Sequence, residues 1–436
     1  MYSIGLDIGT TSICGILVSE DNAIVKSITL DNDSHYSSSL SFERLQNPER
    51  IVEICQSIYH SLKEIASSPC VIGVTGQMHG ILYVNHEGKS VSPLYTWQDG
   101  RGDLPLEDDT YASRLSAITG YKVATGYGMV THYYNTLHSI VPDNATKLAT
   151  IQDYVVMRLC DMSEPILHPS NSASLGLYDL EKLEWDYEAM DKAGIDASIL
   201  PKVSSESFVG TTSLGDRVVV AIGDNQASVY GSVVDDAIVL NIGTGAQISA
   251  ITDYVEVSSP LELRPYVDGK YIVVGCSLCG GHSYSILNEF VSSVLKAFGV
   301  DKSKDEVYQV LGSLASEVSD TTTPIKATTT YRGTRQDPSK RGSIEGISDK
   351  NFDIAHLTLA VLNGIIDELK DFFAQIPSSQ VANIRYVVGS GNAIKKNSLL
   401  RSLITEKFNA EIVIPTIQED ACYGVAKIAR KLGEQI

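Results

Sequence analysis

A short strand-turn-strand pattern occurs twice in this chain and constrains its fold more than any other feature. Residues 2–19 read YSIGLDIGTTSICGILVS, and residues 237–251 read AIVLNIGTGAQISAI. In each copy an apolar strand turns through Ile-Gly-Thr and continues as a second apolar strand. The segment Asp7-Ile8-Gly9-Thr10 aligns with Asn241-Ile242-Gly243-Thr244, which indicates an internal duplication. We therefore expect two related halves.

The length and the remaining pattern agree with two domains of mixed α/β structure. A chain of 436 residues exceeds what one hydrophobic core usually fills. We place the boundary near residue 230, so that the N-terminal domain covers residues 1–230 and the C-terminal domain residues 231–436. Residues 2–30 read as a meander of strands. Periodicity predicts further strands at 70–77, 217–224 and 384–391, and helices at 48–66, 151–161 and 354–375.

The first Ile-Gly-Thr turn is suited to phosphate. Glycine has no Cβ, so backbone N–H groups and the hydroxyls that follow can approach a phosphate closely. Three hydroxyl residues follow Gly9 in a row: Thr10, Thr11 and Ser12. Asp7 stands just before the turn, where it would hold Mg²⁺ through water, because Mg²⁺ keeps several waters and takes only one or two carboxylates.

The second copy of the turn strengthens the interpretation of the first copy as a phosphate-binding turn. A single Gly-Thr turn is most often only a hairpin. Gly243 and Thr244 repeat it, and two such hairpins resemble the actin-like ATPase architecture, in which each hairpin contacts one side of a nucleotide triphosphate. The motifs G-x-x-x-x-G-K-[ST] and G-x-G-x-x-G do not occur at the first turn.

Charge and composition exclude several classes of partner. The chain carries 34 basic and 53 acidic residues, a formal net charge of -19. Nucleic acids and anionic membranes require concentrated positive charge, so we expect neither as a partner.

Targeting and cysteine signals favour a cytoplasmic protein. The N-terminus MYSIGLDIG has no basic and apolar signal regions, and no run of 18 apolar residues occurs. Seven scattered cysteines indicate reduced thiols. Cys276 and Cys279 form a C-x-x-C, but a zinc site would need more ligands than His282 can add, so a structural role is favoured.

Five further segments resemble the FGGY carbohydrate kinases, in that family's order and over nearly the whole chain: GQMHG (76–80), TWQDGR (96–101), GDNQAS (223–228), LNIGTG (240–245) and VVGSGNAIKKNSLLRSL (387–403). The resemblance implies two duplicated actin-like, ribonuclease H-like ATPase domains with a nucleotide and sugar cleft between them. It also implies ATP and Mg²⁺ as cofactors and a ketose as substrate.

The resemblance assigns the catalytic role to Asp224. In a kinase the acceptor hydroxyl loses its proton as the γ-phosphoryl group arrives, and a nearby carboxylate orients that oxygen and accepts the proton. A helix N-terminus would keep Asp224 ionised. Taken alone, the residue reads as a helix N-cap, and one aspartate can do both.

The family positions also imply a sugar site of paired polar groups with one aromatic surface. The polar candidates are Gln77, His79, Asp99, Arg101, Asn171 and Asn225, with Trp97 as the aromatic face and the backbone of Met78 as a further contact. Two alternatives stay open. His79 reads equally well as an interior histidine, and Asp99 with Arg101 as a structural ion pair.

The nucleotide base is expected at a strand-to-helix turn in the second half. Gly389 and Gly391 would let a purine lie flat against the backbone, and Asn392 and Asn397 would bond the base or ribose. The alternative is a glycine turn needed only for packing.

The sequence thus predicts an ATP-dependent ketose kinase that phosphorylates a terminal primary hydroxyl. The leading acceptor is sedoheptulose, and xylulose or another pentulose is the alternative. A non-catalytic actin-like sensor of sugar or nucleotide is a rival from another class, and a homodimer is left open. Gly245 and Ala246 replace hydroxyl residues that often follow the second turn in the family, and residues 125–140 match it only loosely, which leaves the sugar length undecided.

Overall fold

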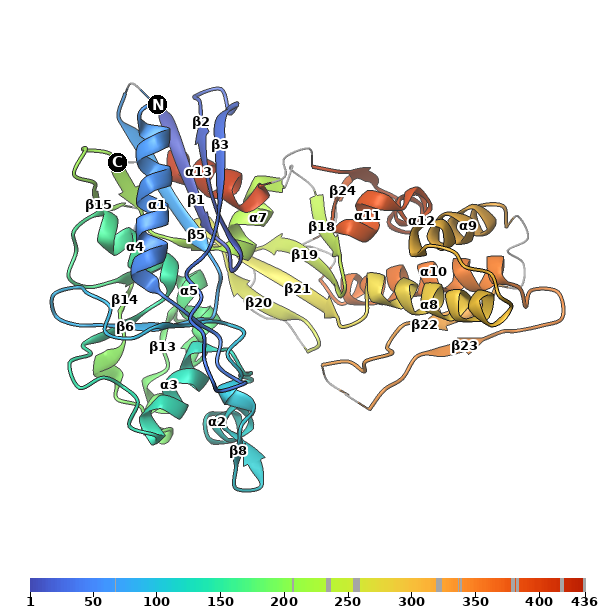
Figure 1. Cartoon of the computed structure of the whole chain (residues 1–436), viewed down its shortest axis with the longest axis horizontal. Coiled ribbons are helices and arrows are strands. Elements are labelled where there is room, and N and C mark those ends of the chain that lie inside the picture. The colour runs from blue at the N-terminus through green and yellow to red at the C-terminus, as the bar shows by residue number, and fades with distance from the viewer. Residues whose placement is uncertain are drawn as a thin grey trace. The chain divides into compact units, whose positions relative to one another are not determined.

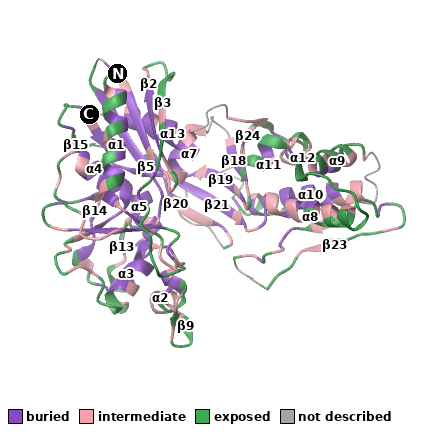
Figure 2. Cartoon of the chain, in the orientation of Figure 1, coloured by how far each residue is buried: buried purple, intermediate pink, exposed green. Residues whose placement is uncertain are grey.

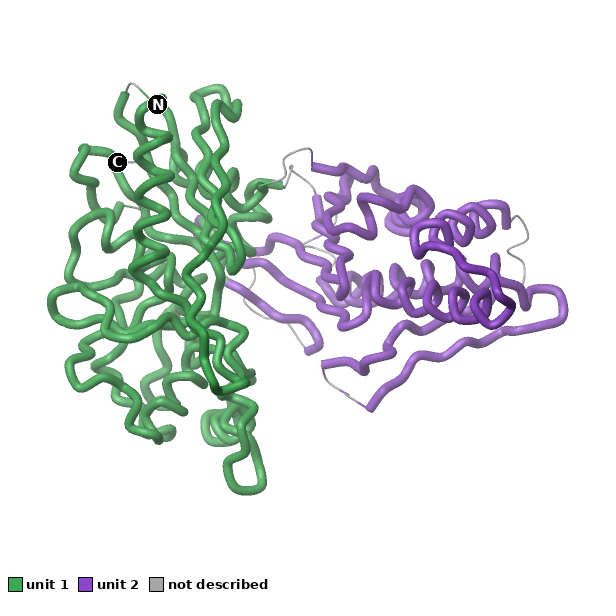
Figure 3. Tube along the Cα trace, viewed as in Figure 1, with its two compact units in different colours: residues 1–232, 265–267, 417–436 green, residues 233–264, 268–416 purple. Residues whose placement is uncertain are grey.

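The chain divides into two compact units (Figure 3). The structure, a computed structural model, describes residues 1–66, 68–205, 208–232, 237–253, 259–318, 324–335, 337, 339–377, 381, 384–415 and 419–433. Unit 1 consists of residues 1–232, 265–267 and 417–436, and unit 2 of residues 233–264 and 268–416. The expected ranges 1–230 and 231–436 differ from these units because the C-terminal helix α13 (Asp420–Gly433) packs on the sheet of unit 1.

A seven-stranded sheet forms the centre of unit 1 (Figure 1). Its order is β15-β16-β5-β1-β2-β3, and β17 also pairs with β5. The strands are β1 (Tyr2–Ile8), β2 (Ser12–Val18), β3 (Ile24–Asp31), β5 (Cys70–Gly76), β15 (Phe208–Thr211), β16 (Arg217–Val219) and β17 (Ile222–Gly223). β1, β2 and β3 are antiparallel neighbours, as the meander predicts, whereas β1 and β5 run parallel.

Two helices cover opposite faces of this sheet because the strands are apolar on both sides. Ile13 and Leu17 of β2 join the core beneath α1 (Pro48–Lys63), and Cys14 and Ile16 join the cluster beneath α13. The α1 helix begins at a cap, because Asn47 Oδ1 accepts hydrogen bonds from the backbone N–H groups of the first turn, and Pro at the first helical position suits that start. Figure 2 shows the buried strands and the exposed outer side of α1.

A second core within unit 1 packs shorter elements. The helices around it are α2 (Tyr111–Thr119), α3 (Gly128–Leu137), α5 (Pro169–Leu175) and α6 (Tyr187–Lys192), while α4 (Ile151–Leu159) packs against α1. Two-stranded sheets join β4 (Leu45–Gln46) to β7 (Leu94–Tyr95), β6 (Leu82–Val84) to β10 (Lys147–Ala149), β8 (Pro105–Leu106) to β9 (Asp109–Thr110), β11 (Ile166–Leu167) to β14 (Lys202–Val203) and β12 (Tyr178–Asp179) to β13 (Glu184–Trp185).

The central strands of unit 2 repeat the order of the central strands of unit 1. Its six-stranded sheet runs β20-β21-β19-β18-β24-β25, with β18 (Ala237–Ile242), β19 (Ala246–Thr252), β20 (Glu262–Pro265), β21 (Tyr271–Ser277), β24 (Tyr386–Ser390) and β25 (Glu411–Val413). β18 pairs antiparallel with β19 and parallel with β24, as β1 pairs with β2 and β5. The duplication read from the sequence is therefore a duplicated sheet.

The helices of unit 2 pack around this sheet. They are α8 (Gly281–Ala297), α9 (Lys304–Ser316), α10 (Ile354–Ala374), α11 (Asn392–Lys396) and α12 (Ser398–Phe408). α10 lies on β19 and β21, and its apolar stripe forms the core of the unit. A short hairpin, β22 (Lys326–Thr328) with β23 (Ser343–Glu345), packs beside α10 through β22.

One expected element is divided. The apolar run 217–224 was predicted as one strand, but β16 ends at Val219, β17 holds two residues, and α7 (Asp224–Ser232) begins at the aspartate. The side chains of Thr75, Ser170 and Asn171 form hydrogen bonds with the backbone of residues 221–223. These bonds replace part of the hydrogen-bond ladder between strands. Within the described residues, none of the helices has both the length and the apolarity needed to cross a bilayer.

Candidate active site

The first hairpin turn lies between β1 and β2 and is held by Asn32. The Nδ2 group of Asn32 donates to Gly9 O at 2.9 Å, and its backbone N–H donates to Thr11 O at 2.9 Å. A Cβ at Gly9 would stand 2.8 Å from Ser12 O, so the tight turn requires glycine. Thr11 is exposed, and Ser12 is half-buried at the start of β2.

Thr10 belongs to a hydrogen-bonded network with the candidate sugar residues. Its Oγ1 lies 3.3 Å from Gln77 Oε1 and accepts from Trp97 Nε1 at 3.1 Å. Gln46 completes the network: its Nε2 donates to Thr10 O at 3.0 Å, and its Oε1 accepts from Gln77 Nε2 at 2.7 Å. The structure therefore joins one residue of the expected phosphate turn directly to two residues of the expected sugar site.

Asp7 occupies a strongly negative environment. Burial is the largest cause that raises the pKa of Asp7 to about 7, and the charges of three other carboxylates raise it further: Asp224, Glu419 and Asp420. A carboxylate that is costly to ionise in this way is stabilised by a nearby cation.

Asp224 is the first residue of α7, and the backbone before it is fixed by side chains. Asn171 Nδ2 donates to Ala221 O at 3.1 Å, and Thr75 Oγ1 donates to Ile222 O at 2.7 Å. The N–H of Gly223 donates to Ser170 Oγ at 3.2 Å. Asp224 and Asn225 are both half-buried in the first turn of the helix. Because the bonds come from β5 and α5, the helix start is positioned by tertiary contacts.

Met78 and His79 follow Gln77 in a constrained loop. A Cβ at Gly223 would lie 2.8 Å from Met78 Sδ, so the thioether packs directly beside the start of α7. His79 adopts a φ of 73°, which is unusual for a residue other than glycine. Its Nδ1 lies 2.6 Å from Ser174 O and therefore donates to that carbonyl, and its ring stacks on Tyr127 at 4.5 Å. The histidine is thus held by α5 and by the start of α3.

Asp99 and Arg101 form a buried ion pair. Arg101 Nε donates to Asp99 Oδ1 at 2.6 Å, and Asp99 Oδ2 also accepts from the backbone N–H of Arg44 at 3.1 Å. The guanidinium lies 4.2 Å from the ring centroid of Tyr95. Asp99 is 0% and Arg101 is 1% exposed, so both groups face protein partners and serve to position the loop that carries Trp97.

Asn171 is also fully buried and bonded to protein. Besides Ala221, its Nδ2 contacts both carboxylate oxygens of Asp153 at 3.2 and 3.1 Å, and its Oδ1 accepts from Gln152 at 3.0 Å. Burial raises the pKa of Asp153 to about 8, although the hydrogen bonds from Thr150 and Asn171 lower it. Asn171 thus connects a buried acid to the backbone before Asp224.

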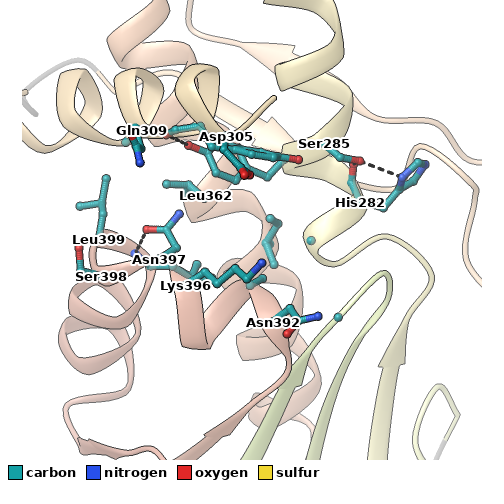
Figure 4. A pocket seen from close by; sticks show the side chains of 18 of the residues that line it. His282, Ser285, Asp305, Gln309, Leu362, Asn392, Lys396, Asn397, Ser398 and Leu399 are labelled. Atoms are coloured by element: carbon teal, nitrogen blue, oxygen red, sulfur yellow. Dashed lines mark hydrogen bonds between the residues drawn. The ribbon is translucent and has the colours of Figure 1, made fainter. Parts of the chain in front are cut away.

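In unit 2 the second hairpin turn borders a cavity of about 940 Å³ (Figure 4). Gly243 and Thr244 line it, together with Asn392 and Asn397 from α11 and its C-terminal end. The turn is fixed to the start of α8, because the N–H of Gly281 donates to Gly243 O at 2.7 Å and that of Gly280 to Thr244 O at 2.9 Å. The opposite wall consists of α8 and α9, with polar side chains at His282, Ser285, Asp305 and Gln309.

The two remaining glycines have packing roles. Gly391 adopts a φ of +85°, and a Cβ there would lie 2.4 Å from Ile242 O. A Cβ at Gly389 would lie 2.8 Å from Ile394 Cγ2. Neither lines the cavity as Asn392 does. Asn397 Oδ1 caps α12 by accepting from the N–H of Leu400 at 3.0 Å.

Comparison with known proteins identifies the family. The N-terminal domain of the FGGY family of carbohydrate kinases matches residues 2–239, more than half of the 436 residues. This chain belongs to the FGGY family. It is therefore a phosphotransferase that acts on a sugar hydroxyl, and the non-catalytic sensor considered from the sequence is set aside.

Known proteins that are similar to this chain align with nearly all of it. A sedoheptulokinase of Mus musculus is 29% identical over 98% of this chain and 96% of its own length. The solved xylulose kinase of Rhodospirillum rubrum superposes with a TM-score of 0.82 at 18% identity, covering 99% of this chain and 90% of that one. The glycerol kinase of Plasmodium falciparum, solved with ADP, gives 0.77 at 18% identity, with 99% and 90% covered. These two structural likenesses establish the fold.

Several residues that support the candidate site were not among the predicted site residues. Gly280 and Gly281 follow a strand and open a helix, a signal that marks them as a close approach of backbone. Gln46, Thr75 and Ser170 carry no such signal. Nothing in the sequence indicates that these three side chains form hydrogen bonds with the backbone of residues far away in the chain.

Proposed function

We propose that this chain transfers the γ-phosphoryl group of ATP to the terminal primary hydroxyl of a ketose. Sedoheptulose is the leading acceptor, with sedoheptulose 7-phosphate as product. A relative named sedoheptulokinase that aligns over 98% of the chain supports this acceptor. The fold neighbour solved with ADP supports an adenine nucleotide as donor.

One observation carries the proposal. In unit 1 the hydroxyl of Thr10, on the turn expected to bind phosphate, is hydrogen-bonded to Gln77 and Trp97, which are expected to bind sugar. A phosphoryl group held by that turn and a sugar held by those two side chains would lie close together. Phosphoryl transfer depends mainly on such positioning.

Asp224 would orient the acceptor hydroxyl and take its proton late in the transfer. It is the first residue of α7, and a helix N-terminus favours negative charge. The three bonds to residues 221–223 support the role, because they fix the backbone that presents this carboxylate. Asn225 would contact a neighbouring sugar hydroxyl, and Met78 and His79 would close the same wall.

Asp7 would hold Mg²⁺ mostly through water. Its pKa is raised first by burial and further by the charges of three carboxylates, and Mg²⁺ bound with nucleotide would offset those charges. Bound Mg²⁺ neutralises charge on the phosphate oxygens. Among the described residues no group of three or more His, Cys, Asp and Glu side chains converges on a metal position.

The cavity of unit 2 would hold the adenosine part of ATP. Its volume of about 940 Å³ lies at the upper end of the range usual for ligand pockets, and its walls combine apolar and amide side chains. Asn392 and Asn397 line it beside the second hairpin turn, which would contact the phosphates through Gly243 and Thr244.

Coupled ADP release with a panel of ketoses tests the proposal. We expect turnover that depends on the ketose, with the highest kcat/KM for sedoheptulose, and a loss of about 10³-fold or more in kcat for Asp224→Asn with little change in ketose affinity. Full activity in Asp224→Asn, or wild-type protein that releases no more ADP with any ketose than without, would refute it.

Xylulose is the second candidate acceptor. A relative named xylulose kinase, from Staphylococcus xylosus, is 24% identical over 100% of this chain and 91% of its own length, which supports this acceptor. The same panel decides between a seven-carbon and a five-carbon ketose by the ratio of kcat/KM values.

A further inference from the structure

The single hydroxyl proton of Thr10 is already engaged in a hydrogen bond to Gln77 and is therefore not directed at a phosphate. A threonine hydroxyl carries one hydrogen and two acceptor lone pairs. The indole N–H of Trp97 can only donate, so at 3.1 Å it occupies one lone pair of Thr10 Oγ1. The single proton of Thr10 is directed at Gln77 Oε1, 3.3 Å away.

The orientation of both amides follows from one fixed bond. The carbonyl oxygen of Thr10 can only accept, so the group of Gln46 that lies 3.0 Å from it is the amide NH₂. The oxygen of Gln46 therefore faces Gln77 and accepts from the NH₂ of that amide at 2.7 Å. This leaves Gln77 Oε1 facing Thr10. Gln46 is 0% exposed, so the bond that sets this order is shielded from water.

We propose that Gln77 withholds the hydroxyl proton of Thr10 from the nucleotide until a sugar engages Gln77 and Trp97. The inference rests on the proposed function, and it adds a positioning role for Gln46, which orients Gln77. A sugar hydroxyl that donates to Gln77 Oε1 competes with Thr10 for that oxygen, and the bond from Thr10, at 3.3 Å, is the one that yields. The freed proton then turns to a phosphoryl oxygen, so this hydrogen bond forms only when an acceptor is present.

The consequence is suppression of futile ATP hydrolysis. A hydrogen bond from a hydroxyl to a charged phosphoryl oxygen changes a rate by about tenfold or more when it acts in the transition state. Without sugar that contribution is absent, because the donor is engaged elsewhere in unit 1. With sugar it is restored, and no covalent step or additional reactant is required.

Substitution of Gln46 tests the arrangement without touching a residue that contacts sugar or nucleotide. Gln46→Met keeps the length of the side chain but removes the amide bonds to Thr10 and Gln77 and the 3.5 Å contact with His35 Nε2, so the amide of Gln77 is free to reverse and release Thr10. We expect ADP release without sugar to rise about tenfold. Adding Thr10→Val should abolish the rise, because no hydroxyl remains. Gln98→Met, the same change at an exposed position beside Trp97, should leave ADP release unchanged.

Gln77→Met gives a second route should Gln46→Met fold poorly. It removes the acceptor itself, and it too should raise ADP release without sugar about tenfold, reversed by Thr10→Val. Unchanged ADP release without sugar in the folded variants would overturn the inference. A rise that persists in the Thr10→Val double variants would also overturn it, because the effect would then not pass through Thr10.

Tryptophan resonances give a readout that does not depend on turnover. The chain has two tryptophans, and Trp185 donates to Pro201 O at 3.1 Å inside a core, so it serves as an internal reference. In protein labelled with 5-fluorotryptophan, ketose alone should shift the ¹⁹F signal of Trp97, and Thr10→Val should shift the same signal without ketose. Failure of both shifts would overturn the inference.

Failure of the inference and failure of the proposed function are distinguishable. Wild-type protein whose ADP release does not respond to any ketose would reject the proposed function, and the inference with it. Wild-type protein with ketose-driven turnover, together with Gln46→Met and Gln77→Met variants that hydrolyse no more ATP without sugar than wild type, would reject only the withholding of the Thr10 proton.

Discussion

The contact between α7 and α13 leaves no room for a methyl group at Gly424. A Cβ there would lie 1.8 Å from Ala227 O, and a Cβ at Gly231 would lie 2.1 Å from Asp420 O. Both obstacles are backbone atoms, which cannot turn away as a flexible side chain can. Gly424→Ala must therefore move one helix away from the other.

The size of the movement follows from the geometry. A Cβ essentially never approaches a heavy atom closer than 3.0 Å, so the separation must grow by at least 3.0 minus 1.8, or about 1.2 Å. Overpacking of this kind costs about 1–3 kcal/mol, whereas alanine gains back at most about 1 kcal/mol of helix propensity. Because Asp224 begins α7, the proposed base would shift as well, and a displacement of about 1 Å lowers a rate by about 10²-fold.

Urea unfolding and coupled ADP release measure the two effects in the same preparation. We expect Gly424→Ala to lower the free energy of unfolding of unit 1 by about 1–2 kcal/mol and kcat by about 10²-fold. The control for the unfolding measurement alone is Gly312→Ala on α9, where the nearest atom to a new Cβ is Tyr284 Oη at 3.9 Å, because Gly312 also lines the cavity of unit 2. It should be neutral or stabilise by about 0.5–1 kcal/mol.

The reasoning fails if the two alanine variants behave alike. A Gly424→Ala protein that unfolds at the wild-type urea concentration would mean that the helices separate at no cost. A destabilised variant with wild-type kcat would mean that the position of α7 does not determine that of Asp224.

Three further predictions concern a buried acid, an ion pair to a buried carboxylate and the glycine that opens α8. The folded protein holds the Asp153 proton up to about pH 8, whereas the unfolded chain releases it near 3.8, so the free energy of unfolding should fall as pH rises between these values, and Asp153→Asn should flatten that fall in urea titrations. Lys63→Met should lower the free energy of unfolding by about 3 kcal/mol, because it leaves the carboxylate of Asp216, 0% exposed, without its cation at 2.7 Å; Lys89→Met, at an exposed pair, should change it by less than about 0.5 kcal/mol. Gly281→Ala places a Cβ 2.6 Å from Gly243 O, so calorimetry should show ATP binding weakened about tenfold or more, and unchanged affinity would contradict the role of that turn.

The sequence predicts the secondary elements well where one local rule dominates. The meander at residues 2–30, the helix after Asn47 and the helix from Ile354 follow from periodicity and caps that neighbouring residues supply. It fails at residues 217–224, because the apolar run fits a strand and the interruption is imposed by side chains from α5 and β5.

The sequence also predicts one part of the candidate site and not another. Asp7, Thr10, Gln77, Trp97 and Asp224 lie around the turn and the helix start that the motifs indicate. Those motifs cannot separate residues that face a ligand from residues that support them. The interior positions of three candidates, Asp99, Arg101 and Asn171, depend on what packs around them.

The sequence by itself determined that two similar strand-turn-strand hairpins exist and that an aspartate opens a helix, because glycine, β-branched residues and caps act within a few positions of themselves. Only the tertiary structure decided that α13 belongs with the first sheet and that Gln46 orients Gln77 against Thr10. Those facts depend on groups far apart in sequence that meet at hydrogen-bonding distance, and no local preference encodes which distant partner a buried amide will find.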